Sequence, residues 1–530
     1  MIAENGRRLE GISRSLLAPG KQIELIRPEQ IVRIVGSKAT SEVILREISN
    51  VLAKLETRTF DANLLAPDCL SPRSLEEVGR ITNTVVRLDT NTQKVRLGIR
   101  PQILLLPFTN YTCYQILAHW IPDTAVREGL ENTGDAVFRL LLSASSQSTT
   151  HTHGKMTVLP ESDVKGGRFL VDSYNKEKWS WKDRTGQWAR WITATPSQTT
   201  SQTETELLEK IPAAFGSGIG LETALLADQA SLSSTGWPEA LQRSTRVVFG
   251  HVLHRYPPKR PHQLDLTQTA ILSPVIPPLS TLTFPNGPQP STPSASTILM
   301  RFLPDPSQDP SLVSAAPPLE LRLEASDTEI SGISSLRAIF TDATTTTTHD
   351  ILLPSSAVDI RLYQSHFHEL TGAALTSDPR HSDHPVFAFL DASDLRPSAG
   401  RLVTPPRIPG VPVPILPAPD RADATAAGGV VDYLFAGLEM RRAVAADYEG
   451  WRLVYTDVEA GQGGGRRAEL ALEAVPSAAM TTTTTTTEVQ PNGAAEGEGS
   501  TKVRDTAAYL AVVAKIAAGG EFKWYGDNTW

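Results

Sequence analysis

Residues 32–52 read VRIVGSKATSEVILREISNVL and place a short run rich in β-branched residues directly before an amphipathic helix. β-branched residues are enriched in strands, so QIVRIVG, residues 30–36, is predicted to form one strand of a hairpin. The helix is predicted over 39–55 because apolar residues recur there at three- and four-residue spacing. They form one stripe made of Val43, Ile44, Ile48, Val51, Leu52 and Leu55.

The residues upstream complete a small α/β pattern. In KQIELIRPE, residues 21–29, Ile23 and Leu25 alternate with polar residues, and a turn at Pro28 leads into the strand that follows. Leucine and isoleucine recur at helical spacing between residues 7 and 17, and Pro19 and Gly20 end that helix. The predicted order is therefore helix, strand, strand, helix.

Length and composition limit the classes of protein that the chain can belong to. Its 530 residues suggest three or four structural units, and 40% hydrophobic residues allow globular cores, while 39 prolines indicate long linkers. The formal net charge of −8 argues against a chain that coats nucleic acid through bulk electrostatics. Two cysteines exclude a disulfide framework and a four-cysteine zinc site, and no apolar run is long enough to span a bilayer.

A second copy of the same pattern follows at residues 71–99, SPRSLEEVGRITNTVVRLDTNTQKVRLGI. A helix is predicted first, and then two strands in which Val86 and Leu88 lie opposite Val95, Leu97 and Ile99 across the turn DTNTQ. The closing helix, ENTGDAVFRLLL, begins only at residue 131. The stretch at about 100–130 is interpreted as an insertion or as retained intron sequence.

A basic segment with four tryptophans lies between residues 165 and 191. Interleaved aromatic and basic side chains suit single-stranded RNA, because bases stack on the rings. On that hypothesis the RNA-binding residues are Trp179, Trp181, Lys182, Arg184 and Trp188. The alternative is a two-stranded hairpin with the tryptophans packed beneath a small sheet and Trp179 and Trp181 on one strand face, and the residues favour this alternative.

From residue 245 the chain consists of short β-branched or alternating runs separated by proline and polar turns, which is typical of a sandwich or a barrel-like domain. Three low-complexity tracts are predicted to hang outside its core as disordered inserts: the threonines at 344–348 and 481–487, and the proline-rich TPPRIPGVPVPILPAP at 404–419.

No catalytic motif occurs in the sequence, and neither a metal site nor a cofactor is predicted. The pairs His366/His368 and His381/His384 lack convergent carboxylates or cysteines, so surface histidines are expected. EAGQGGGRR, residues 459–467, lacks the ending of a phosphate-binding loop and is predicted to be a tight hairpin turn. The sequence therefore predicts a protein that is not an enzyme.

The first sixty residues resemble a KH domain. Residues 32–52 look like its last strand and final helix, and ENGRRLEGISRSLL, residues 4–17, looks like the helix after its nucleic-acid loop. In KH modules a G-x-x-G loop clamps about four nucleotides. The matching positions are Ala3, Glu4, Asn5 and Gly6, with Arg7, Arg8 and Lys38 placed to support RNA binding.

The resemblance has three further implications. The first strand and first helix of this module would lie upstream of Met1, so the chain is expected to be N-terminally shortened. Ala3 restricts the backbone where the motif has glycine, and Glu4 brings a negative charge to the phosphate position. The second unit has Cys69, Leu70, Ser71 and Pro72 at the loop positions, and the absence of glycine there favours a structural role.

The motifs beyond these units resemble, in their order, the fungal mitochondrial inner-membrane-bound regulators called Sls proteins. They are FGHVLH, FLPDPS, PPLELRL, LLPSSAVDIRL, GRLVTPPRIP, DYLFAGLEMRR, GWRLVYTDVEAGQGGGRR and EFKWYG. The resemblance implies a location on the matrix side of the mitochondrial inner membrane. It also implies a role that couples mitochondrial transcripts and transcription to membrane-bound translation, with mitochondrial mRNA, the mitochondrial RNA polymerase and translation factors as partners.

The predicted fold class is α+β, with two degenerate KH-like αββα units followed by a β-rich C-terminal domain that contains disordered inserts. The first KH-like domain, N-terminally truncated, covers 1–58, and the second covers 59–142. The Trp/basic region and its linkers cover 143–240, and the β-rich domain covers 241–530. Two functional hypotheses remain open: an RNA-associated regulator, and a protein–protein scaffold whose KH-like folds do not bind RNA.

Overall fold

The structure is a computed structural model that divides into two compact units. The first unit comprises Met1–Ser146 with Val403–Pro406, and the second comprises Gln147–Leu402 with Arg407–Trp530. The structure describes residues 22–26, 31–89, 115–122, 129–150, 155–165, 167–172, 176–193, 242–258, 263–268, 270–277, 295–325, 333–377, 384–396, 401–413, 429–476, 506–519, 522 and 524.

The first unit begins with the predicted hairpin and helix. Strands β1 (Gln22–Ile26) and β2 (Ile31–Val35) are antiparallel, and helix α2 spans Lys38–Ala53. The Ser37 hydroxyl accepts a hydrogen bond from the Thr40 backbone N–H at 3.2 Å and so begins the helix. These elements confirm the predicted strand–strand–helix order, while the helix predicted over 7–17 lies outside the described residues.

The second part of the first unit contains one strand more than the predicted αββα order. Its sheet has the antiparallel order β3-β5-β4. In chain order the elements are β3 (Glu56–Asp61), η1 (Ala62–Leu64), η2 (Pro67–Leu70), α3 (Pro72–Thr82), β4 (Val85–Asp89), β5 (Gln115–Trp120) and α4 (Thr133–Thr150).

This sheet contains a strand pairing that was not expected. Strand β4 pairs with β5, so that Val86 lies opposite Ala118 and Leu88 opposite Ile116. The strand expected to be its partner, around residues 95–99, lies outside the described residues. Strand β5 falls inside the stretch interpreted as an insertion, and it is the central strand of the sheet. It holds this place because alternate side chains, among them Ile116 and Ala118, are fully buried.

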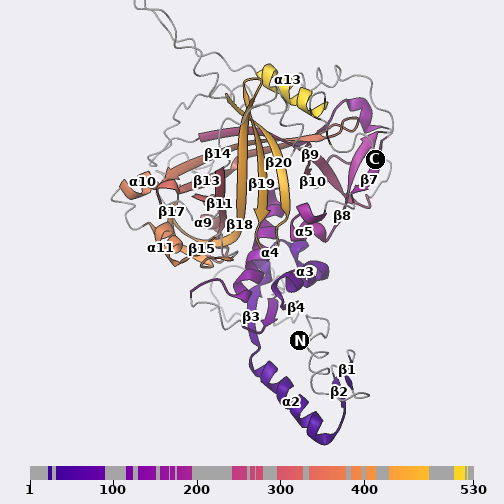
Figure 1. Ribbon diagram of the computed structural model, residues 1–530, viewed down its shortest axis with the longest axis vertical. Helices are drawn as coiled ribbons and strands as arrows, with labels where there is room; N and C mark the ends of the chain where they lie inside the picture. Colours follow the sequence, from indigo (N-terminus) through magenta and orange to yellow (C-terminus); the bar gives the residue numbers. More distant parts are fainter. Residues whose placement is uncertain are drawn as a thin grey trace, which may run out of the picture. The chain divides into compact units, whose positions relative to one another are not determined.

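The second unit contains a closed barrel of eight strands (Figure 1). Strand β9 pairs with β14 on one side and with β20 on the other, and this double pairing closes the ring β14-β13-β12-β11-β18-β19-β20-β9. A barrel, rather than a sandwich, is therefore the form of the predicted β-rich domain. The strands are β9 (Gln242–Tyr256), β11 (Ala295–Pro304), β12 (Leu319–Ala325), β13 (Arg337–Leu352), β14 (Asp359–Thr371), β18 (Gly429–Tyr448), β19 (Trp451–Ala460) and β20 (Arg466–Pro476).

Further strands extend the barrel sheet. Strand β6 (Lys155–Val158) runs parallel to β13, β8 (Gln187–Thr193) pairs with β9 and with β7 (Gly167–Asp172), β10 (Ala270–Pro274) pairs with β9, and β17 (Arg407–Val413) pairs with β18. The described strands of 143–240 thus belong to the barrel sheet. Two tracts predicted to hang outside the core also form strands of this sheet, because 344–348 lies within β13 and part of the proline-rich tract forms β17. The remaining elements are η4 (Glu161–Val164), η5 (Lys176–Lys178), α5 (Trp181–Arg184), α9 (Pro310–Ala315), η6 (Ile333–Ser335), α10 (Gly372–Ser377), α11 (Pro385–Ala392), β15 (Asp394–Arg396), β16 (Arg401–Val403) and α13 (Thr506–Ala517).

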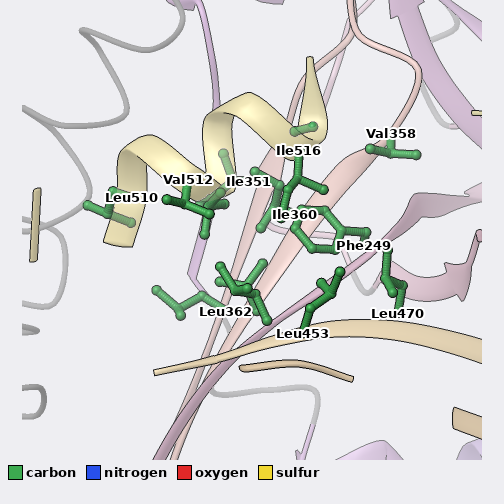
Figure 2. Close-up of a cluster of buried hydrophobic side chains, with 14 of the residues drawn as sticks. Phe249, Ile351, Val358, Ile360, Leu362, Leu453, Leu470, Leu510, Val512 and Ile516 are labelled. Atoms are coloured by element: carbon green, nitrogen blue, oxygen red, sulfur yellow. The ribbon is translucent and has the colours of Figure 1, made fainter. Parts of the chain in front are cut away.

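The barrel strands have one apolar and one charged face. On β14, Ile360 and Leu362 belong to an apolar cluster with residues of helix α13, while Arg361 and Tyr363 between them line a cavity. Figure 2 shows helix α13 lying over the apolar face of these strands. Because successive side chains of a strand point to opposite faces, a single alternating sequence builds a core on one side and a charged lining on the other.

A second apolar cluster covers another part of the sheet. Its buried members include Met300 and Phe302 of β11 and Tyr433 of β18, with Phe389 of α11 packed edge-on against Phe302. The Tyr433 hydroxyl donates a hydrogen bond to the Pro317 carbonyl at 2.6 Å, so its polar end is satisfied in this core.

Among the described helices, none has both the length and the apolar composition needed to cross a lipid bilayer.

Candidate functional site

Only one of the predicted RNA-binding residues of the first KH-like unit is described. Ala3, Glu4, Asn5, Gly6, Arg7 and Arg8 all lie outside the described residues. Lys38 is the first residue of α2, and its side chain is exposed. A cation at this position can reach a phosphate in solvent without losing an internal partner.

The loop position of the second KH-like unit lies inside the protein. Cys69 is fully buried at the end of η2, and the Ser71 hydroxyl accepts a hydrogen bond from the Ser74 backbone N–H at 3.2 Å, which caps α3. The residues at the loop position therefore begin helix α3, and this arrangement favours the structural role that was predicted from the missing glycines.

The tryptophans of the basic segment are core residues. Trp179, Trp181 and Trp188 are 3%, 4% and 6% exposed, and a base cannot stack on a ring that protein already covers. The Trp179 indole N–H donates to the Ser273 hydroxyl at 3.3 Å, and that of Trp188 donates to the Asp183 carbonyl at 2.7 Å. In the described structure these rings are therefore not available for stacking, and the packing alternative describes them better.

The position of two of these tryptophans differs from that alternative. Trp179 and Trp181 do not share a strand face, because they lie in the connection between β7 and β8, where Trp181 begins the short helix α5. Lys182 and Arg184 follow on the same helix and are half-buried. The Arg184 guanidinium donates to the backbone carbonyls of Trp179 and Gly464 at 2.8 and 2.6 Å, so this arginine holds the connection against the β19–β20 turn.

The glycine-rich stretch forms the predicted tight turn. Strands β19 and β20 are joined at residues 461–465, where the Gly464 N–H donates to the Gly461 carbonyl at 2.8 Å. A side chain at Gly465 would lie 2.4 Å from the carbonyl oxygen of Lys178. Glycine is required at this position because the η5 backbone packs directly on the turn.

The predicted surface histidines are buried. His366, His368 and His384 are 3–4% exposed, and His384 Nδ1 accepts a hydrogen bond from the Val386 N–H at 3.3 Å, which begins α11. His381 lies outside the described residues. Within the described ranges no three His, Cys, Asp or Glu side chains gather as a metal site would require.

The most conspicuous polar feature of the second unit is a cavity of about 1050 Å³. Its walls come from barrel strands β9, β11, β13, β14, β18, β19 and β20, together with β6, β10, part of the β7–β8 connection and the glycine turn. Lys155, Leu266 and Thr267 line it and are exposed, so the cavity is open to solvent. Its acidic residues are Asp183, Asp350, Glu439 and Glu469, and its basic residues are Lys155, Lys178, Arg246, Arg301, Arg361, Arg441 and Arg467.

Glu439 is the centre of an ionic network in this cavity. Its carboxylate lies 2.7 Å from the Arg441 guanidinium and 3.3 Å from those of Arg301 and Arg467. Burial opposes ionisation of this carboxyl, but the three guanidinium groups outweigh that effect and hold the pKa of Glu439 far below its usual range. Glu469 accepts a hydrogen bond from Arg467 at 2.6 Å and is likewise ionised.

Asp350 and Arg361 form a second buried pair in the cavity wall. One arginine nitrogen lies 2.7 Å from a carboxylate oxygen of Asp350, and both side chains are less than one-tenth exposed. Arg246 differs from these arginines, since within the described structure its side chain lies over the Tyr363 ring at 5.3 Å and forms no ion pair. Cation–π contact leaves the N–H groups of a guanidinium able to bind an anion.

Sequence reasoning missed the cavity, although a signal was present. Charges alternate with apolar residues within predicted strands, as in GLEMRR (437–442) and RRAELALEA (466–474). In a barrel such alternation places a row of charges on the inner face.

A buried ion pair outside the cavity was also missed. Arg190 and Asp359 are 3% and 1% exposed at the side chain and lie 2.9 Å apart. The carboxylate also accepts the backbone N–H groups of Val252 and Leu353, each at 2.9 Å, and so joins β8, β9 and the start of β14. Sequence distance hides this pair, because 169 residues separate its members.

Comparison with known families defines the class of protein. Residues 177–518 match the model of the SLS1 protein C-terminal beta barrel domain, and residues 1–55 match that of the SLS1 protein first KH domain. An N-terminal KH-like region followed by an eight-stranded barrel is the architecture described above. Since the barrel match covers more than half of the chain, the chain belongs to the SLS1 family. A KH domain in a family of this architecture indicates an RNA-associated role.

Comparisons with individual proteins add little. The chain is similar to the Pct1 RNA triphosphatase of S. pombe, both in complex with the Spt5 CTD and alone, at 10% and 8% identity with TM-scores of 0.21 and 0.22. The alignments cover 44% of this chain and 71% and 70% of those chains. TM-scores this low carry no argument about fold or activity. The comparison with curated proteins found no match.

Proposed function

We propose that the chain is a non-enzymatic, RNA-associated regulator of mitochondrial gene expression. In this role it couples mitochondrial mRNA and transcription to translation at the matrix side of the inner membrane, with the mitochondrial RNA polymerase and translation factors as partners. The observation that carries the proposal is the SLS1 first KH domain match over residues 1–55, followed by a second KH-like unit and the family's barrel.

Three carboxylates of the cavity support binding rather than catalysis. Asp350, Glu439 and Glu469 each contact an arginine, and the pKa values of Glu439 and Glu469 are lowered. A general acid or base needs a pKa near the working pH, so these carboxylates are poorly suited to proton transfer.

One observation favours the scaffold alternative for part of the chain. The loop position of the second KH-like unit is capped and contains a fully buried cysteine, Cys69, so this loop is poorly suited to clamp RNA. The first KH-like unit is then the part of the KH-like region that would bind RNA.

RNA binding by the first KH-like unit can be tested by charge reversal. We expect the full chain to bind a single-stranded RNA, with log affinity falling linearly as log salt rises and a slope of about −1.4 to −2 for two or three phosphate contacts. Arg7→Glu combined with Arg8→Glu, and separately Lys38→Glu, should weaken binding and reduce this slope. Fluorescence anisotropy across a salt series measures both quantities.

Lys54→Glu is the matched control, because Lys54 is exposed just beyond the other end of α2, about 24 Å from Lys38 along a helix of 16 residues. It changes the net charge by the same amount and should leave affinity nearly unchanged. If wild-type chain shows no binding at low salt, or if Lys38→Glu and Lys54→Glu act alike, the RNA-binding function is refuted and the scaffold function remains.

The location is tested separately, by fractionation of cells that express the tagged chain with any native upstream sequence. Protection from protease in mitochondria with ruptured outer membranes, together with sedimentation with inner membranes, is the expected result. Recovery in another compartment would contradict the proposed site of action whatever the RNA affinity.

A further inference from the structure

We propose that the charged cavity of the barrel is a binding site for an oligophosphate group, meaning a chain of two or three phosphates. This proposal does not depend on RNA binding by the KH-like units, because every residue that lines the cavity belongs to the second unit.

The first argument is the charge of the lining. Seven basic and four acidic side chains leave a surplus of three positive charges in a space with partly apolar walls. The carboxylates of Asp350, Glu439 and Glu469 are each paired with an arginine, so a further anion is attracted by the positive charge that these pairs leave over. A diphosphate or triphosphate carries a negative charge that matches this surplus.

The second argument is the kind of cation. Five of the seven basic residues are arginine, whose planar fork of N–H donors binds phosphate oxygens in pairs. Arg246 lies over the Tyr363 ring, and Arg301 is 44% exposed at its side chain although it also lies 3.3 Å from Glu439, so both can turn N–H groups toward a ligand. Arg246 belongs to β9 and Arg301 to β11, so an anion between them could be bound from two walls of the cavity.

The third argument is the state of Lys178. Its side chain donates to the Pro274 carbonyl at 3.3 Å, and burial lowers the pKa of its ammonium group. A bound anion would offset this burial, which is a reason for a partly buried lysine to line the cavity.

The volume decides between a single phosphate and a longer group. A cavity of about 1050 Å³ is slightly larger than most small-molecule sites, which measure roughly 300–1,000 Å³. Basic residues spread over β6, β9, β11, β14, β18 and β20 suit a chain of phosphates better than one compact ion. The same chemistry is offered by a free nucleoside triphosphate and by the 5′-triphosphate end of an RNA.

The direct test is titration of the full chain with inorganic tripolyphosphate at physiological ionic strength, followed by calorimetry and thermal unfolding. We expect saturable binding and a higher unfolding temperature. Arg246→Gln and Arg301→Gln should each weaken binding by about ten- to a hundredfold, the effect of losing hydrogen bonds to a charged group. Unfolding without ligand checks that both variants are folded.

Arg396→Gln is the matched control, because Arg396 is a surface arginine of the same unit, paired with Asp394 and absent from the cavity lining. It should bind tripolyphosphate as the wild type does. Absence of binding at millimolar tripolyphosphate, or equal weakening by all three variants, would overturn the proposal, the latter because it would reveal non-specific attraction.

Competition experiments distinguish the two sources of the phosphate chain. Displacement of tripolyphosphate by a short RNA with a 5′-triphosphate, but not by the same RNA with a 5′-hydroxyl, identifies an RNA end as the ligand. Displacement by a nucleoside triphosphate but by neither RNA identifies a free nucleotide. Equal displacement by both RNAs would contradict the proposal, since the cavity would then bind ordinary backbone phosphates. Lys38→Glu should leave all these results unchanged, so a failure here is separable from a failure of KH-mediated RNA binding.

Discussion

Replacement of Asp359 by alanine is expected to lower the free energy of unfolding of the barrel unit by about 3–5 kcal/mol, the usual cost of breaking a buried ion pair from one side. The Arg190 guanidinium would remain buried at 3% exposure with no carboxylate beside it. Burial disfavours the ionised carboxyl, but the charge and hydrogen bonds of Arg190 outweigh this and hold the pKa of Asp359 below its usual range.

The loss of two further hydrogen bonds adds to the destabilisation by Asp359→Ala. The backbone N–H groups of Val252 and Leu353 would lose their acceptor at the same time, and an unsatisfied buried donor costs about 1–3 kcal/mol. Arg190 would keep its bonds to the carbonyls of Ala357 and Ser356, at 3.1 and 2.9 Å, so the loop before β14 would stay near it but hold an uncompensated charge. The damage is therefore expected where β8, β9 and β14 meet.

Urea denaturation of the full chain, monitored by tryptophan fluorescence, measures this loss. Asp359→Asn keeps the size of the side chain and isolates the effect of its charge. Asp394→Ala is the control, because the Asp394–Arg396 pair is solvent-exposed and such pairs contribute about 0–1 kcal/mol. A cost for Asp359→Ala no larger than that of the control would show that the buried pair does not hold these strands together.

Local pattern predicted local structure well. The β1–β2 hairpin and helix α2 follow from alternation and from a three- and four-residue stripe, signals that lie within about twenty residues of each other. The glycine turn between β19 and β20 was likewise readable, because turn chemistry depends on a few adjacent residues. The presence of a β-rich domain followed from repeated short strands, but that pattern is common to sandwiches and barrels.

Features that depend on distant residues were not predictable. Closure of the barrel requires β9 to pair with both β14 and β20, which is a matter of long-range register and not of local preference. The same limit explains the tryptophans, since a basic, aromatic segment looks alike whether its rings face solvent or pack beneath β9 and β10. The described partner of β4 is β5, which lies beyond a stretch of 25 residues outside the described structure and so could not be found from adjacent residues.

The stability of the barrel unit is expected to fall steeply between pH 6.5 and 5. Burial lowers the pKa values of His251, His254 and His349 from 6.5 to about 4. The positive charge of Arg190 lowers the pKa of His251 further, and that of Lys155 lowers the pKa of His349 further. Nearby aspartates raise these pKa values without restoring the ordinary value; they are Asp172, Asp265, Asp350 and Asp359.

The direction of the pH dependence follows from proton uptake. Above pH 6.5 these histidines are neutral in both states, so their contribution to stability is complete. Between pH 6.5 and 4 the unfolded chain binds protons that the folded chain does not, and the free energy of unfolding falls by up to about 1.4 kcal/mol per pH unit for each histidine. From pH 7 to 5 the loss is about 2 kcal/mol per histidine. Urea denaturation at half-unit steps of pH measures it.

His254→Phe tests the assignment at one site. Both ring nitrogens of His254 are buried without a hydrogen-bond partner in the described structure. The rings of His254 and Phe169 form a T-shaped contact, with their centroids 5.9 Å apart. A phenyl ring can occupy this place without leaving a polar atom unsatisfied, so at pH 7.5 the variant should be at least as stable as the wild type. Between pH 7 and 5 it should lose about 2 kcal/mol less than the wild type does. A variant whose pH profile runs parallel to that of the wild type would mean that His254 is protonated in the folded barrel, and the acid sensitivity would then belong to other groups.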